Sequence, residues 1–377
     1  MNFSLTNDQK EIYELAGEFA RREILPQAAD HDRHQRFPRE IFEKARAIGL
    51  LGLNIPQEYG GSEMGALVLA LVAERLAWAC SGITAAITLN ALIADALLLG
   101  GNEEQKKTYL GRLLAGELGA YAVTEPEAGS DVANIKTRAV ADGDRFVLEG
   151  NKTWISNATE ASFFIIFAKT DPSAGYGGIT AFIVERETRG LVIGKELGKL
   201  GQKAAPAAEL FLSGVVVESK SLLGEVGKGF HLAMQVFDRS RPMVAAFGVG
   251  LIQRCLDESI SYAKQRNTMG KPIFKHQAVG HKIAEMGMRL EAARLLTYQA
   301  AQLLDEGGQT TLKAAYAKAY AADSAMWAAT EAVQIFGGMG YSDEYPVEKL
   351  FRDAKLLQLY EGTSEIQRNI MVRELVR

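Results

Sequence analysis

Residues 162–170 read SFFIIFAKT, and residues 179–185 read ITAFIVE. Both runs are short, rich in aromatic and β-branched residues, and punctuated by glycines, which is typical of β-strands. Similar runs occupy residues 145–149, 191–193 and 209–217. The middle third of the chain is therefore predicted to be a β-domain.

The residues before this β-domain follow the period of α-helices. Thr6 and Gln9 have the spacing of a capping box, and apolar residues then recur at helical intervals as far as Pro26, which should end or bend the helix. Further helical patterns cover residues 41–50, 66–79 and 102–114.

The helical period returns after Gly229. One apolar face runs from Ile283 to Leu303, and an alanine-rich segment, residues 312–336, is expected to pack against helices on both sides. The sequence thus predicts an α+β protein with three domains and clefts at the seams between them. The domains are an N-terminal helical domain at 1–117, a β-domain at 118–228 and a C-terminal helical domain at 229–377.

Composition narrows the possible functions. The chain has 377 residues, more than the roughly 250–300 at which a single core stops growing, so a large ligand can be buried between domains. Its 42 Lys and Arg against 46 Asp and Glu include no long basic tract, so no nucleic-acid partner is expected. Two cysteines and five histidines lie in no disulfide or metal spacing, so we expect two buried thiols and no metal ion.

The N-terminus shows no apolar or Arg-rich leader, and no run is expected to reach the roughly 18 apolar residues that span a bilayer. The expectation is a soluble, cytoplasmic protein without membrane insertion. Removal of a transit peptide would instead place it in the mitochondrial matrix.

Two segments near the β-domain could bind a planar ligand. Residues 121–131, YAVTEPEAGSD, suit a loop that hydrogen-bonds a polar ring and nearby anions, although an ordinary turn would look the same. Residues 151–157, NKTWISN, follow a predicted strand and place Trp154 beside hydroxyl groups. A core Trp with a polar rim is the alternative.

Three further segments could contact a nucleotide. Residues 237–242 and 266–271 carry cations that could bind phosphate, but a solvated helix start or a helix end would carry them too. Residues 334–341 form a glycine-rich helix exit that could approach a pyrophosphate or simply cap the helix. Since no GxGxxG follows a strand and no P-loop motif occurs, any dinucleotide must be bound by a different fold.

The last segment is LYEGTSE at residues 359–365. Glu361 lies between an aromatic ring and a glycine, where burial could raise its pKa into the range of a general base. The alternative is a helix N-terminus capped by Thr363 or Ser364.

Taken in order, these segments resemble the acyl-CoA dehydrogenase family over essentially the whole chain, most closely its medium-chain enzymes. The resemblance implies an N-terminal helical domain, a central β-barrel domain and a C-terminal four-helix bundle. It also implies a homotetramer, a dimer of dimers, with non-covalent FAD shared across a dimer interface. The implied partners are an acyl-CoA substrate and electron transfer flavoprotein.

The resemblance also implies roles for individual residues. Glu361 would take the α-proton of the thioester while the β-hydride passes to flavin N5, yielding a trans-2-enoyl-CoA. Thr124 and Ser156 match positions that hydrogen-bond the flavin ring, and Trp154 matches a position packed beside it. Further matches to cofactor-binding positions are Tyr121, Val123, Gly129, Ser130 and Ile155. Residues matching the FAD pyrophosphate and adenosine sites, several serving the neighbouring subunit's cofactor, are Arg266, Thr268, Gln277, Gln334, Gly338, Thr363 and Glu365. Residues matching the substrate site are Ser130, Asp238 and Arg241 for CoA, with Tyr360, Gly362, Thr84, Thr88 and Leu89 for the acyl thioester.

Substrate choice rests on three positions. Ser240 stands where isovaleryl and long-chain enzymes have their glutamate, so Glu361 is expected to be the only base. Thr84 stands where glutaryl-CoA dehydrogenases have an Arg, which disfavours a diacid, and Leu89 could shorten the acyl pocket. A short-to-medium straight-chain acyl-CoA is therefore predicted. The alternatives are an acyl-CoA oxidase or enoyl-CoA reductase of the same fold, or a catalytically silent flavoprotein, against which the retained Glu361 argues.

Overall fold

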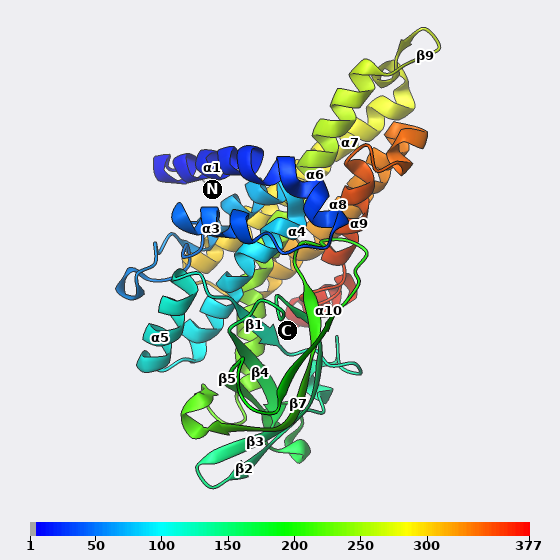
Figure 1. The fold of residues 1–377 in the computed structure, drawn as a ribbon. Helices are drawn as coiled ribbons and strands as arrows, with labels where there is room; N and C mark the ends of the chain where they lie inside the picture. Colours follow the sequence, from blue (N-terminus) through cyan, green and yellow to red (C-terminus); the bar gives the residue numbers. More distant parts are fainter. Residues whose placement is uncertain (1–4) are drawn as a thin grey trace.

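The structure is a computed structural model that describes residues 5–377, with a sheet domain between two helical parts (Figure 1). The N-terminal helices are α1 (Asn7–Phe19), α2 (Ala28–Arg33), α3 (Arg39–Ala47), α4 (Gly65–Gly100) and α5 (Glu103–Leu114). The C-terminal helices are α6 (Gly229–Gln265), α7 (Gln277–Asp305), α8 (Thr311–Phe336), α9 (Val347–Leu357) and α10 (Ser364–Leu375). The predicted helix, strand, helix order is confirmed.

The central sheet has the strand order β6-β7-β3-β2-β4-β5-β8, with β1 parallel to β4. Its strands are β1 (Gly119–Ala122), β2 (Arg138–Asp142), β3 (Arg145–Ser156), β4 (Phe163–Lys169), β5 (Ile179–Glu185), β6 (Leu191–Glu196), β7 (Ala207–Glu218) and β8 (Leu222–Leu223). A separate hairpin, β9 (Asn267–Thr268) with β10 (Lys271–Pro272), links α6 to α7.

Strand β4 is buried on both faces, which explains its unbroken apolar sequence. Phe163, Ile165 and Phe167 pack with apolar residues of α4, α5 and α6. Phe164 and Ile166 point the other way, into a core formed by the sheet's own strands. The run SFFIIFAKT therefore joins the sheet domain to the helical domains.

Several helix boundaries follow from local chemistry. Thr6 and Gln9 form the predicted capping box at α1, and Asn102 and Gln105 form a second one at α5. Helix α8 ends at Gly337, whose φ of 61° favours glycine. The helix predicted to end at residue 79 continues to Gly100, but Cys80 has non-helical torsions (φ −165°, ψ 111°) and bends it there.

Three local predictions were wrong. Tyr121 and Ala122 belong to strand β1 rather than to a loop, because Tyr121 pairs with Ile165 of β4. Residues 151–156 do not follow β3 but form its second half, paired with β7. The segment 237–242 lies inside α6, which starts at Gly229.

The expectation about apolar runs was also wrong. Helix α4 is long and apolar enough to cross a membrane by length and composition alone, but 83 % of its most apolar window is buried inside the protein. It packs against α6, α1, α7 and α5 and against strand β1, so it is a core helix.

Glycines set the spacing between the long helices. A Cβ on Gly250 of α6 would lie 2.4 Å from the Glu74 carbonyl oxygen of α4, and one on Gly248 would lie 2.9 Å from the Ala321 carbonyl oxygen of α8. Helix α6 can therefore lie against both neighbours at backbone contact, which holds α4 and α8 in place around the site described next.

Candidate active site

Glu361 lies in a tight turn between α9 and α10, residues 358–364, which we call the catalytic turn. The Ser364 amide donates to the Gln358 carbonyl (3.0 Å) and closes the turn. Glu361 has φ 52° and Gly362 has φ 87°. A left-handed conformation costs a non-glycine residue on the order of 1–3 kcal/mol and is found most often at functional sites. Thr363 caps α10 by accepting from the Ile366 amide (3.2 Å), so the capping role belongs to Thr363 and leaves Glu361 available.

The Glu361 carboxylate is surrounded by groups of both signs. Ser240 donates its hydroxyl to Glu361 Oε2 (2.5 Å). Burial raises the pKa of Glu361 above its ordinary value, the Asp95 carboxylate adds to the effect, and Ser240, Arg241 and Lys318 oppose it. A carboxylate with a raised pKa binds a proton more strongly, as a general base requires.

Arg241 and Asp238 lie together on α6. Arg241 is only 3 % exposed and forms an ion pair with Asp238, whose other oxygen accepts from the Thr311 hydroxyl (2.6 Å). Burial lowers the pKa of Arg241, and Asp238 and Glu361 counteract this. Arg241 therefore places a buried positive charge close to Glu361, while its contact with CoA stays a prediction.

Trp154 projects outward from a bulge in β3. Its φ is 58°, its side chain is 55 % exposed, and the β3–β7 register shifts between Lys152 and Ile155. The core-Trp alternative was therefore wrong. The Thr153 amide donates to the Thr124 carbonyl (3.0 Å), which places Thr124 beside the bulge that carries Trp154.

The other residues of this region that were predicted to bind the cofactor differ in which of their groups a ligand could contact. The Val123 and Ile155 side chains are buried in separate cores, so only their backbone could contact a ligand. Gly129 and Ser130 are exposed in the loop after β1. The Tyr121 ring packs on Phe167 and Phe237, and its buried hydroxyl finds no hydrogen-bond partner within residues 5–377.

A buried ion pair, which the sequence did not predict, joins the loop after β1 to strand β3. Lys152 is fully buried, and its Nζ lies 2.7 Å from Glu125 Oε1 and 3.1 Å from the Val123 carbonyl oxygen. Glu125 also accepts from the Thr137 amide (3.0 Å). Burial lowers the pKa of Lys152 to about 8 even though Glu125 opposes the shift. The pair fastens the loop after β1 to the bulged strand that carries Trp154.

A second group of predicted cofactor residues lies at the far tip of the molecule. Arg266 and Thr268 are in the β9 region, Gln277 begins α7, and Gln334 and Gly338 lie where α8 ends. All five are exposed. Figure 1 shows β9 and the central sheet at opposite ends of the molecule. One chain therefore does not bring these residues together with Trp154.

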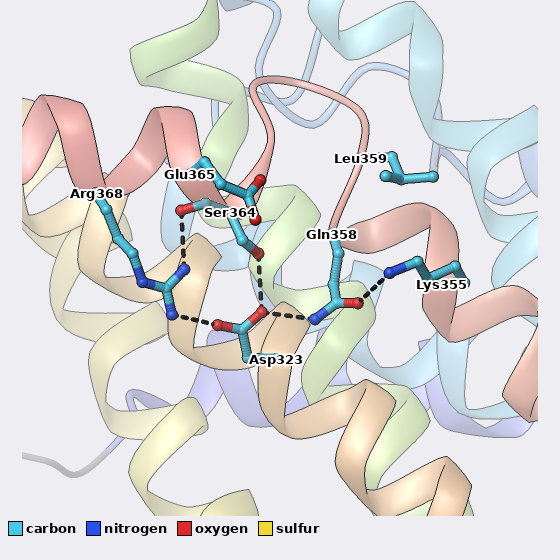
Figure 2. A pocket seen from close by; sticks show the side chains of 7 residues that line it. All are labelled: Asp323, Lys355, Gln358, Leu359, Ser364, Glu365 and Arg368. Carbon is cyan, nitrogen blue, oxygen red and sulfur yellow. Dashed lines mark hydrogen bonds and ion pairs between the residues drawn. The ribbon is translucent and has the colours of Figure 1, made fainter.

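Thr363 and Glu365 lie at the catalytic turn instead. Glu365 lines a cavity of about 320 Å³. Figure 2 shows the hydrogen bonds and ion pairs that join the side chains around this cavity. The lining residues are Asp323, Lys355, Gln358, Leu359, Ser364, Glu365 and Arg368.

The residues matched to the acyl pocket lie on the second half of α4. Thr84 is fully buried and donates its hydroxyl to the Cys80 carbonyl (2.8 Å), and Thr88 donates to the Thr84 carbonyl (2.9 Å). Since both hydroxyls bond their own helix, Thr84 and Thr88 offer methyl groups to a neighbour. Leu89 is partly exposed. These three positions suit an apolar chain.

Two residues that hold the middle of the catalytic turn were not predicted. Lys318 of α8 and Gln367 of α10 donate to its backbone carbonyls. The only sequence signal for Lys318 was its position between two alanines of an alanine-rich segment. Within residues 5–377, no group of three or more His, Cys, Asp or Glu could hold a metal ion, and both cysteines are buried and free.

Comparison with known proteins divides the chain into the same three domains. The N-terminal, middle and C-terminal domains of acyl-CoA dehydrogenases match residues 6–117, 120–215 and 227–376. The chain is 41 % identical to the probable acyl-CoA dehydrogenase YngJ of Bacillus subtilis, with both chains covered completely.

Solved structures show the same likeness. Butyryl-CoA dehydrogenase from Megasphaera elsdenii is 40 % identical, with a TM-score of 0.96 and both chains covered completely. A chain in a structure of the electron transferring flavoprotein of Acidaminococcus fermentans is 39 % identical, with the same TM-score and coverage.

The fold and the site thus define a flavoprotein oxidoreductase whose candidate base is the partly buried carboxylate of Glu361. The chain belongs to the acyl-CoA dehydrogenase family, and its cofactor is FAD. The residues present fit a flavin ring, because the exposed aromatic side chain of Trp154 stands on the bulge to which Thr124 is hydrogen-bonded, and Ser156 ends the same strand.

Proposed function

We propose that the protein converts a short-to-medium straight-chain acyl-CoA to the trans-2-enoyl-CoA and passes the electrons to electron transfer flavoprotein. The observation that carries this proposal is Glu361, a partly buried carboxylate with a raised pKa, held in a left-handed turn beside Ser240. FAD, when bound, supplies the acceptor for the β-hydride, which no side chain can accept.

Glu361 removes the α-proton of the thioester. Because a thioester α-proton is a weak acid, the base needs a raised pKa and the developing negative charge on the thioester oxygen needs a donor. Burial provides the first. The Glu361 amide is available for the second, since it donates no hydrogen bond within residues 5–377.

The serine at position 240 supports Glu361 as the only base. The Ser240 hydroxyl donates to Glu361 Oε2 and so orients the carboxylate. A serine at this position does not supply a second carboxylate. The hydroxyls of Thr84 and Thr88 are bonded within α4, which leaves their methyl groups for an apolar ligand. Together with Leu89, these methyl groups support a hydrocarbon acyl chain of limited length. The likeness to a chain in an electron transferring flavoprotein structure supports the proposed electron acceptor.

The decisive experiment is an anaerobic titration of the FAD-loaded protein with C4, C8 and C16 acyl-CoAs. We expect the flavin absorbance near 450 nm to bleach with C4 or C8 and to return on addition of electron transfer flavoprotein. The absence of bleaching with every acyl-CoA would contradict the dehydrogenase proposal. Rates that peak at C16 would contradict the chain-length proposal, and rapid reoxidation by oxygen alone would indicate an oxidase.

A further inference from the structure

The backbone of the catalytic turn is held by side chains from two helices. Lys318 Nζ of α8 donates to the Gly362 carbonyl (2.6 Å). Gln367 Nε2 of α10 donates to the carbonyls of Glu361 (3.1 Å) and Gly362 (3.0 Å). The carbonyl oxygens of both residues with positive φ therefore accept hydrogen bonds from side chains.

Lys318 is an unusual residue for its surroundings. It is completely buried, and its neighbours on α8 are buried alanines, among them Ala314, Ala317 and Ala321. A fully buried lysine is rare unless it is paired. Burial lowers the pKa of Lys318 to about 8, Glu361, Asp323 and Glu365 oppose the shift, and Arg241 adds to it.

A second α8 residue anchors the ends of the same turn. Asp323 accepts from Gln358 Nε2 (2.7 Å) and from the Ser364 hydroxyl (2.8 Å), as Figure 2 shows. Arg368 of α10 also donates to Asp323 (2.6 Å). Helix α8 thus holds the middle of the catalytic turn through Lys318 and both of its ends through Asp323.

We propose that Lys318 is a positioning residue for Glu361: its ammonium group binds the Gly362 carbonyl, keeps the turn left-handed, and places a positive charge behind the carboxylate. The proposal rests on the proposed function of Glu361 as the base. Without the ammonium group, Gln367 is left as the side-chain donor to that carbonyl among residues 5–377, and the strained Glu361 backbone is free to relax.

The charge has a separate consequence from the hydrogen bond. The charged groups that face Glu361 are Arg241 of α6, Lys318 of α8, and Asp95 of α4. Loss of the Lys318 charge destabilises the Glu361 carboxylate, so the pKa of Glu361 rises further and the active, ionised fraction is reached only at higher pH.

The test compares Lys318→Met, Lys318→Arg and a control, Lys313→Met, which changes a lysine of the same helix outside the turn. Hydrogen–deuterium exchange of the FAD-loaded protein is measured at the amides of residues 361–364, together with the anaerobic rate of flavin reduction by butyryl-CoA from pH 5 to 9. In Lys318→Met we expect exchange to accelerate at least tenfold, reduction to slow at least tenfold, and the acid limb to move to higher pH. Lys318→Arg should restore the acid limb, and Lys313→Met should match the wild type.

Wild-type exchange and an unmoved acid limb in Lys318→Met would overturn the proposal. Should that variant fail to fold, Lys318→Gln keeps a donor without the charge, and an acid limb at the wild-type pH would overturn it equally. If no acyl-CoA reduces the wild-type flavin, the proposed function fails, and the exchange measurement alone then decides whether Lys318 holds the turn.

Discussion

The surroundings of Glu361 have opposing effects on its ionised form. Burial raises its pKa, while Ser240, Arg241 and Lys318 stabilise the ionised form. With a folded-state pKa above the unfolded value, the folded protein binds the proton more strongly. The contribution of Glu361 to stability is therefore present below its unfolded pKa and is lost as the pH rises through its folded pKa.

Replacing Glu361 by Gln removes the base, and it also removes the loss of stability that ionisation of the buried carboxyl group causes at higher pH. We expect Glu361→Gln to keep its FAD, to lose flavin reduction by about 100-fold or more, and to be at least as resistant to heat as the wild type at pH 8. Stopped-flow reduction and thermal unfolding between pH 5 and 8 check these outcomes. Near-normal reduction would mean that the base lies elsewhere.

At the scale of elements, the site depends on how closely α6 approaches its neighbours. Ser240 and Arg241 reach Glu361 from α6, and Lys318 reaches it from α8, so the spacing of these helices sets the geometry around the carboxylate. Gly248 and Gly250 allow backbone contact at the crossings. Side chains at these positions would push α4 and α8 away from α6.

A methyl group at one crossing tests this dependence. Gly250→Ala places a Cβ 2.4 Å from the Glu74 carbonyl oxygen, and overpacking of this kind costs about 1–3 kcal/mol. We expect its denaturation midpoint to fall. Gly287→Ala is the matched control, because a Cβ there meets nothing within 4 Å among residues 5–377 and alanine favours the helix. Equal midpoints for the two variants would show that the crossing tolerates a side chain.

At the scale of the whole molecule, two groups of the predicted cofactor residues lie at opposite ends of the molecule. Thr124, Trp154 and Ser156 belong to the sheet domain. Arg266 follows the end of α6, beside β9, and Gln334 lies at the end of α8, where Phe336 stacks on Tyr262 of α6. Figure 1 shows β9 and the sheet at opposite ends of the molecule. One copy of the chain therefore does not bring the two groups together. This separation supports the proposal that FAD is shared between copies in a tetramer.

Arg266→Ala should weaken FAD binding about tenfold or more, as expected for loss of a charged hydrogen bond. Lys264→Ala, another exposed cation near the same tip, should not. In the wild type, sedimentation followed at 280 and 450 nm should show flavin only in species larger than one chain. A monomer that retains FAD, or full FAD content in Arg266→Ala, would contradict sharing.

Much of the fold was predictable because its signals are local. The capping box at α1, the strand at 179–185 and the helix end at Gly337 each depend on residues within a few positions of one another. Strand β1 was missed because it is stabilised by pairing with β4, more than forty positions later in the chain. The burial of α4 could not be predicted from its composition, since an apolar helix packs equally well in a core or a bilayer.

The sequence by itself determined the order of helical and sheet domains, the family, and Glu361 as the candidate base, because these follow from local periodicity and from motifs in a set order. The tertiary structure alone decided which groups surround that base. Ser240 is 121 positions from Glu361, and Lys318 is 44 positions from Gly362. Contacts over such separations depend on how α6, α8 and α10 pack, and the packing also decided that Gly362 and Glu361 adopt the left-handed backbone that Lys318 and Gln367 hold.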